Sequence, residues 1–188
     1  MEHLNQIKKK NEQAIFFGIH QANWELLVPS LDKLGIRVGA IYRHINNPYI
    51  NTLIINFRTK TLDSKETFYT PKGKKSAKDI LDGIKKNSSI VLLIDQKDSA
   101  GEDVVFFNSV TKTQTGFLKI AKKHKMQIIP VQNTRNNLNN FTLKFYPPLK
   151  PFNNHLTDKQ AMEEIHKIIE EWIKENPSHY FLQHNRFS

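Results

Sequence analysis

The stretch AIFFGIHQANWE, residues 14–25, decides the fold. Its first four residues form a continuous apolar run, which is short enough for a β-strand buried on both faces. From Trp24 onward the pattern becomes helix-like. We therefore predict a strand over residues 14–19, then a tight turn, then a helix over residues 24–34.

His20 and Glu25 lie five positions apart in this stretch. On a regular helix such residues point about 140° away from each other, because one turn takes ~3.6 residues. They can meet only if the chain turns between them, with Asn23 as the N-cap of the helix that follows. A carboxylate beside an imidazole orients the ring and stabilises its charged form, which gives a general base. The alternative is a structural pair, with Glu25 stabilised only by the helix dipole.

The rest of the chain alternates between strand and helix patterns. Further strands are predicted over residues 37–42, 66–70, 89–94, 127–131 and 141–146, and further helices over residues 48–59, 74–86, 115–124 and 158–175. This alternation predicts an α/β fold with a mainly parallel or mixed central sheet flanked by helices. Residues 14–188 are interpreted as a single domain that follows a polar, basic segment over residues 1–13.

Composition limits the function classes. The formal net charge is +10, from 23 lysines and 5 arginines against 18 acidic residues. A lysine-rich surface suits an anionic partner such as lipid headgroups or an acidic carrier protein, whereas few arginines and no recognition motif argue against nucleic acid. An excess of Lys, Asn and Ile is also typical of an AT-rich genome.

The absence of cysteine excludes thiol catalysis and disulfides. No run of ~18 apolar residues and no signal-peptide pattern is found.

The motif around His20 resembles two groups of known enzymes. His-x4-Glu is similar to the motif of the glycerolipid acyltransferases. The fuller His-x-Ala-Asn-Trp-Glu resembles the lipid A biosynthesis acyltransferases, which add lauroyl or myristoyl chains to lipid A precursors. Further segments resemble that family in the same order, at residues 42–48, 58, 93–98, 104–107, 113–116, 128–131, 176–180 and 184–187. The chain departs from the family pattern at Asn108, where a glycine is usual, and at residues 178–179 and 182–183.

The resemblance implies an O-acyltransferase of the glycerolipid-acyltransferase-like fold. Its donor would be a fatty acyl thioester, most simply on acyl carrier protein, and its acceptor a hydroxyl of a lipid A precursor or related phosphorylated lipid. His20 would take the hydroxyl proton while Glu25 holds the imidazole. No cofactor and no metal are expected, because the thioester is already activated.

The resemblance also implies a location and a rival interpretation. The family carries a membrane-anchoring helix before the His motif, whereas only 13 residues precede the first predicted strand here. We therefore expect peripheral attachment at the cytoplasmic side of the bacterial inner membrane. The alternative is a truncated, inactive remnant that binds lipid or a partner.

Two arginines are candidate ligands of the acceptor phosphate. Arg58 occupies the position of a family arginine, and Arg43 follows the second predicted strand. A guanidinium suits phosphate because its planar fork donates two hydrogen bonds. The alternative for each is a solvated cation. His184 and Arg186, in the C-terminal segment, are expected to be structural.

Asp95 and Gln96 follow the apolar run of residues 90–94. Function in α/β proteins is concentrated at the carboxyl ends of such strands. We expect both residues to orient substrate or to brace the His20 loop, and we group Asn23 with them as substrate-binding. The alternative for Asp95 is a plain turn aspartate.

Overall fold

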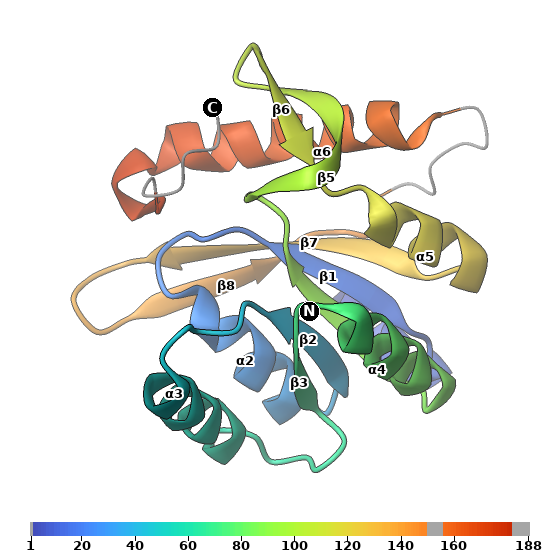
Figure 1. The fold of residues 1–188 in the computed structure, drawn as a ribbon, viewed down its shortest axis with the longest axis vertical. Coiled ribbons are helices and arrows are strands. Elements are labelled where there is room, and N and C mark those ends of the chain that lie inside the picture. Colours follow the sequence, from blue (N-terminus) through green and yellow to red (C-terminus); the bar gives the residue numbers. More distant parts are fainter. Residues whose placement is uncertain (1, 150–155, 182–188) are drawn as a thin grey trace. The chain divides into compact units, whose positions relative to one another are not determined.

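The computed structural model describes residues 2–149 and 156–181. The chain divides into two compact units, one made of Met1–Phe16 and Glu25–Leu92 and the other of Phe17–Trp24 and Leu93–Ser188. Most of their helices and strands are labelled in Figure 1.

The first unit alternates strands and helices. Its elements are α1 (Glu2–Lys10), β1 (Ala14–Gly18, as far as Phe16), α2 (Leu27–Lys33), β2 (Val38–Tyr42), α3 (Pro48–Lys60), β3 (Phe68–Pro71), α4 (Lys74–Lys85) and β4 (Ser89–Leu93, as far as Leu92). The strands lie in the order β3-β2-β4-β1. Strand β2 pairs in parallel with both β3 and β4, with Gly39 opposite Phe68 and Val38 opposite Ser89. Parallel neighbours require crossover connections, which α3 and α4 provide.

Glycines fix two points in this unit. Gly35, at φ +76°, follows the C-cap Leu34 of α2, and its N–H donates to the carbonyl of Asp32 at 2.8 Å. That is the C′ position where only glycine adopts the left-handed conformation without cost. Gly39 is needed for a different reason, because an added Cβ would lie 2.6 Å from the Phe68 ring and 3.1 Å from Ile80.

We expect Gly39→Ala to lower the free energy of unfolding by about 1–3 kcal/mol, because an extra methyl group in a packed strand forces its neighbours to shift. Urea denaturation followed by circular dichroism measures this change. Gly116→Ala is the matched control, since its added Cβ meets nothing within 4 Å. Equal stabilities for the two variants would contradict the packing argument.

The second unit contains the remaining elements. They are β5 (Lys97–Phe106), β6 (Ser109–Thr113), α5 (Gly116–His124), β7 (Gln127–Arg135), β8 (Phe141–Phe145), α6 (Asp158–Glu175) and a 3-10 turn at Pro177–His179. Strand β7 lies between β1 and β8, and β7 and β8 form an antiparallel hairpin. The largest fully buried side chains of this unit are Phe17, Phe106, Phe117, Leu118, Ile129, Met162, Ile165, Ile169 and His166.

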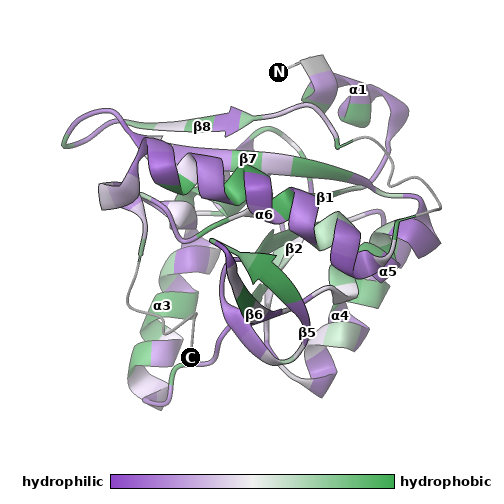
Figure 2. Ribbon diagram, turned by 90° about the horizontal axis from the view of Figure 1, so that it is seen from above, coloured by the Kyte–Doolittle hydropathy of each residue, from purple (hydrophilic) through white to green (hydrophobic). Residues whose placement is uncertain are grey.

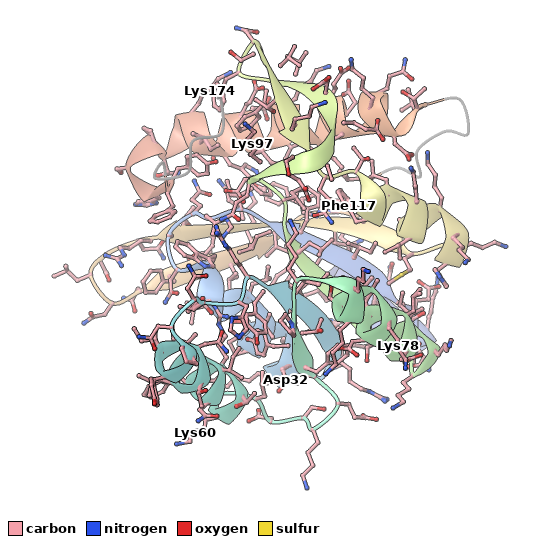
Figure 3. All side chains as sticks on the ribbon, viewed as in Figure 1. Asp32, Lys60, Lys78, Lys97, Phe117 and Lys174 are labelled. Carbon is pink, nitrogen blue, oxygen red and sulfur yellow. The ribbon has the colours of Figure 1, made fainter. Side chains whose placement is uncertain are left out.

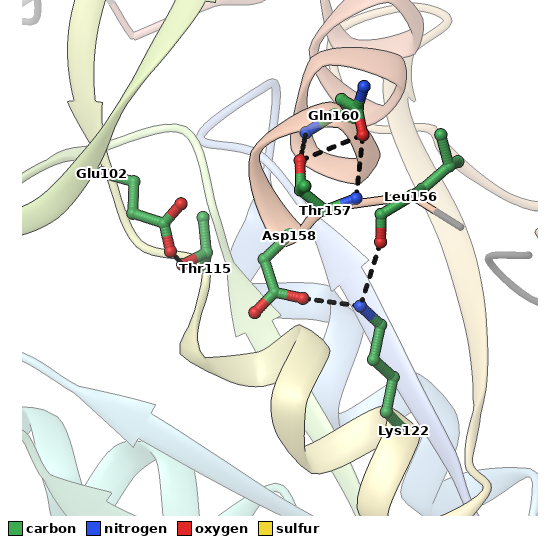
Figure 4. Close-up of polar contacts among 7 residues, drawn as sticks. All are labelled: Glu102, Thr115, Lys122, Leu156, Thr157, Asp158 and Gln160. Atoms are coloured by element: carbon green, nitrogen blue, oxygen red, sulfur yellow. Dashed lines mark hydrogen bonds and ion pairs between the residues drawn. The ribbon is translucent and has the colours of Figure 1, made fainter. Parts of the chain in front are cut away.

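Helix α6 begins as the sequence predicts. Thr157 is its N-cap, and its hydroxyl accepts from the N–H of Gln160 at 3.2 Å while the Gln160 side chain accepts from the N–H of Thr157 at 2.9 Å (Figure 4). This reciprocal capping box satisfies two N–H groups that the helix itself cannot. Lys122 of α5 adds an ion pair to Asp158 at 2.7 Å.

Strands β5 and β6 form a hairpin that the sequence analysis does not predict. Its two-residue turn has Phe107 at φ 47° and Asn108 at φ 59°, as a type I′ turn requires. Asparagine tolerates this conformation, so Asn108 fits where the family pattern has glycine. The Phe107 N–H is held by a hydrogen bond of 2.7 Å to the Glu170 carboxylate of α6.

The predicted α/β class is confirmed, with a mainly parallel sheet that the antiparallel pair β7–β8 makes mixed. All predicted strands and helices are present, although α2 begins three residues late, after a 3-10 turn at Trp24–Leu26. Helix α1 was not predicted, and its Leu4 and Ile7 are each only 2% exposed. Among residues 2–149 and 156–181, no helix has both the length and the apolar character to cross a membrane.

Candidate active site

The ends of two strands bring the site residues of the second unit together. Strand β1 ends at Gly18, whose carbonyl accepts from the N–H of Ile94 at 3.2 Å. His20 lies two residues after the end of β1. Strand β4 ends at Leu93, and Asp95 and Gln96 follow Ile94 directly. The carboxyl ends of neighbouring strands are where α/β folds gather functional side chains.

Asp95 holds His20 with both carboxylate oxygens. Its Oδ1 lies 2.8 Å from His20 Nδ1, and its Oδ2 accepts from the His20 backbone N–H at 3.2 Å. The Asp95 side chain is 2% exposed and that of His20 is 14% exposed. Because a carboxylate only accepts hydrogen bonds, the contact assigns the ring proton to Nδ1 and leaves a lone pair on Nε2. A neutral imidazole in this tautomer is a base at Nε2.

Other groups surround the imidazole. The Gln96 side-chain nitrogen lies 3.2 Å from His20 Nε2, so its amide can donate to the lone pair there. The Trp24 ring meets the imidazole edge-on with 5.0 Å between centroids, and Phe181 packs against Trp24 at 5.6 Å. Gln96 is thus the neighbour that contacts Nε2 itself, while Trp24 packs against the ring.

The loop after His20 is held by the backbone and by buried amides. Ala22 adopts φ 50°, and its N–H donates to the carbonyl of His179 at 2.7 Å. Gln21 is fully buried and donates to the carbonyl of Trp172 at 3.0 Å. The side-chain amide of buried Asn133 donates to the Asn23 carbonyl. Gln21 occupies the variable position of the His-x-Ala-Asn-Trp-Glu motif and Asn133 stands in no motif, so the sequence assigns neither of them a role.

The prediction that Asn23 caps the helix is wrong. Helix α2 begins at Leu27, its N-cap is Leu26, and no side chain caps it. The 3-10 turn that intervenes displaces the helix from Asn23, whose backbone carbonyl is instead engaged by Asn133. The substrate-binding role of Asn23 stays a prediction.

Glu25 and Arg58 form an ion pair in the first unit. Arg58 Nε donates to Glu25 Oε2 at 2.8 Å, and Arg58 Nη2 donates to Oε1. The guanidinium lies 5.8 Å from the Tyr42 ring and 5.7 Å from the Tyr69 ring. The hydrogen bond to Glu25 raises the pKa of Arg58, and burial raises the pKa of Tyr69 well above its usual range. This Glu25–Arg58 pair therefore presents a fixed cation beside a phenol that stays neutral.

The structure thus gathers the predicted site residues in two groups. His20, Asp95 and Gln96 form one, and Glu25 and Arg58 form the other. Arg43 follows β2 as an exposed side chain. His184 and Arg186 lie outside the described residues. The role of Glu25 as the group that holds the imidazole stays a prediction, while the hydrogen bond to Nδ1 comes from Asp95.

Comparison with known proteins gives one family. The family model described as bacterial lipid A biosynthesis acyltransferase matches residues 1–188. A search of the curated proteins found no match.

Proposed function

This chain belongs to the bacterial lipid A biosynthesis acyltransferase family, and from that premise we propose its acyl donor, its acceptor and its catalytic residues. The donor is a fatty acyl thioester on acyl carrier protein. The acceptor is a hydroxyl of a lipid A precursor or of a related phosphorylated lipid. His20 and Glu25 are the catalytic residues of this proposal.

The observation that carries the proposal is the grip of Asp95 on His20. The carboxylate contacts both the ring and the backbone N–H of the histidine, at 2.8 Å and 3.2 Å. Such a grip fixes the tautomer and the direction of the ring before substrate arrives, which is the condition for efficient general-base catalysis. Asp95 is a positioning residue, because it acts through His20.

The proposed reaction needs one base and no acyl-enzyme. His20 Nε2 takes the proton of the acceptor hydroxyl while that oxygen attacks the thioester carbonyl carbon. The tetrahedral intermediate collapses as its C–S bond breaks, and the leaving thiolate takes the proton from the imidazolium. An ester and a free thiol result. The Gln96 amide contacts Nε2 at 3.2 Å, so it must leave this atom when the hydroxyl binds, and it can then donate to the acceptor oxygen.

Glu25 is proposed as the second member of the dyad, held in place by Arg58. A bidentate arginine fixes the plane of a carboxylate more firmly than a lysine does. Arg58 and Arg43 are also proposed to meet the acceptor phosphate. These two roles of Arg58 make different kinetic predictions.

We expect Arg58→Lys to lower kcat/KM by roughly tenfold or more. A tenfold loss corresponds to an activation free energy raised by ~1.4 kcal/mol, because the carboxylate or phosphate is no longer held in place. The free energy of unfolding should change by less than about 1 kcal/mol, because the pair is partly exposed. A fall in kcat at saturating acceptor means that Arg58 acts through Glu25. A rise in the KM of the acceptor alone means that it binds phosphate. Arg37→Lys, in the exposed pair with Glu66, is the matched control, and equal kinetics for the two variants would contradict both roles.

The test of the proposed function is acyl transfer by the purified chain. A series of acyl carrier protein thioesters of different chain lengths serves as donors, and a bacterial lipid extract in detergent serves as acceptor. Acylated product identified by mass spectrometry gives chain length and acceptor together. A folded chain that binds the lipid extract but transfers nothing would overturn the proposal in favour of a lipid-binding protein without activity.

A further inference from the structure

Among the described residues, helix α3 leaves four large apolar side chains exposed. The α3 face consists of Tyr49, Ile50, Leu53 and Phe57, which are 84%, 47%, 55% and 62% exposed. No residue of α3 is buried. At about 100° of rotation per residue, these four side chains fall within ~100° around the helix axis, so they form one face. Hydrophobic residues run along the length of α3 in Figure 2.

Local signals fix where α3 begins. Asn47 is the N-cap, and its side-chain oxygen accepts from the N–H groups of Tyr49 at 3.0 Å and Ile50 at 3.2 Å. Pro48 occupies the first helical position, where its missing N–H costs nothing.

A contiguous set of large exposed apolar side chains marks an interaction surface, whereas scattered ones are ordinary. Two of the four are aromatic, and tyrosine suits a boundary where one end of the ring is apolar and the other is wet. Aromatic and aliphatic side chains are also what interfacial helices insert into the headgroup layer of a bilayer.

The charges around the α3 face select the partner. Residues 43–62 contain no aspartate or glutamate; exposed Arg43 precedes the helix by five residues, and exposed Lys60 is its last residue. Lys60 projects from the end of α3 in Figure 3. This arrangement complements a negatively charged lipid surface. A second copy of the chain is disfavoured as partner, because each copy brings the same cations and a net charge of +10.

We propose that the α3 face docks on the surface of an anionic phospholipid bilayer. Tyr49, Ile50, Leu53 and Phe57 enter the headgroup layer, and Arg43 and Lys60 contact lipid phosphates. The inference deepens the proposed function, and rests on it for the expectation that the acceptor lies in a membrane. It assigns the contact with that membrane to α3.

The test is sedimentation of the full chain with vesicles of phosphatidylcholine alone and of an equimolar mixture with phosphatidylglycerol. We expect binding to the mixed vesicles and weak binding to the neutral ones. Leu53→Ser with Phe57→Ser should lower the partition coefficient by roughly tenfold or more for each side chain lost from the bilayer. Leu138→Ser, at an 85% exposed leucine of the β7–β8 loop, is the matched control and should bind as the unchanged chain does. An unchanged unfolding temperature confirms that the double variant is folded.

A second readout reports insertion directly. Compared with the unchanged chain, whose signal comes from Trp24 and Trp172, Phe57→Trp should add a blue-shifted tryptophan signal that brominated lipid quenches, with the mixed vesicles only. Equal binding by the double variant and the unchanged chain would overturn the inference. So would a dimer in size-exclusion chromatography that the double variant alone abolishes, because the partner would then be a second copy.

The failure of this inference can be told from the failure of the proposed function. A chain that binds vesicles yet transfers no acyl group refutes the proposed function alone, whereas one that acylates detergent-dispersed lipid but does not bind vesicles refutes this inference alone.

Discussion

His20→Gln is expected to lower acyl transfer by roughly 10²–10⁴-fold, the usual contribution of a positioned general base. Glutamine has a similar size and retains hydrogen-bonding groups, but it cannot take a proton from the acceptor hydroxyl. Its amide can still donate to Asp95 Oδ1, which His20 Nδ1 contacts at 2.8 Å, so the fold around the site should survive. The measurement is the rate of acyl transfer at saturating donor and acceptor.

The control for this variant is His3→Gln, in α1, which shares the chemistry of the substitution but not the site. We expect the loss to appear in kcat, because the proton moves only in the transition state. Residual transfer within threefold of the unchanged chain would contradict the assignment of His20 as the base. A loss confined to KM would instead make His20 a binding residue.

The elements that the sequence predicts are those with strong local patterns. Strand β1 is fully buried along its length, as its continuous apolar run predicts, and α6 buries the face of Met162, Ile165, Ile169 and Trp172. Helix α1 lacks such a signal, since only Leu4 and Ile7 are apolar and buried in it. The β5–β6 hairpin has no clear sequence pattern, because β5 is polar over most of its length and only Val104 and Phe106 are buried in it.

The site divides in the same way between local and non-local information. His20 could be identified from its neighbours in the chain, and Asp95 from its place after a buried strand. Their contact joins residues 75 positions apart and depends on which strands lie side by side, which no local pattern encodes. The Glu25–Arg58 pair spans 33 positions and is hidden for the same reason. Asn133 lies in β7 but begins an asparagine-rich stretch, residues 133–140, in which nothing in the sequence distinguishes it from the other asparagines.

Asp95→Asn is expected to lower kcat by roughly 10²–10⁴-fold, although only one atom is exchanged. Two donors face this side chain, the His20 backbone N–H at 3.2 Å and the ring Nδ1 at 2.8 Å. A carboxylate accepts from both, whereas an amide has one oxygen. If that oxygen stays on the backbone N–H, the amide NH₂ faces Nδ1, which must then carry a lone pair. The ring proton moves to Nε2, and the base is lost, as in the equivalent variant of a serine protease triad.

This prediction can be checked without activity, because it concerns a tautomer. Nitrogen-15 spectra of histidine-labelled protein should place the His20 proton on Nδ1 in the unchanged chain and on Nε2 in Asp95→Asn. His166 serves as an internal reference, since its Nδ1 lies 2.7 Å from the carbonyl of Val105 and should keep its proton in both. Asp103→Asn, at an exposed carboxylate paired with Lys112, should change neither the spectrum nor kcat. A lowered kcat in Asp95→Asn with an unchanged His20 tautomer would show that Asp95 acts on the substrate. An unchanged kcat would show that Asp95 has no part in the mechanism.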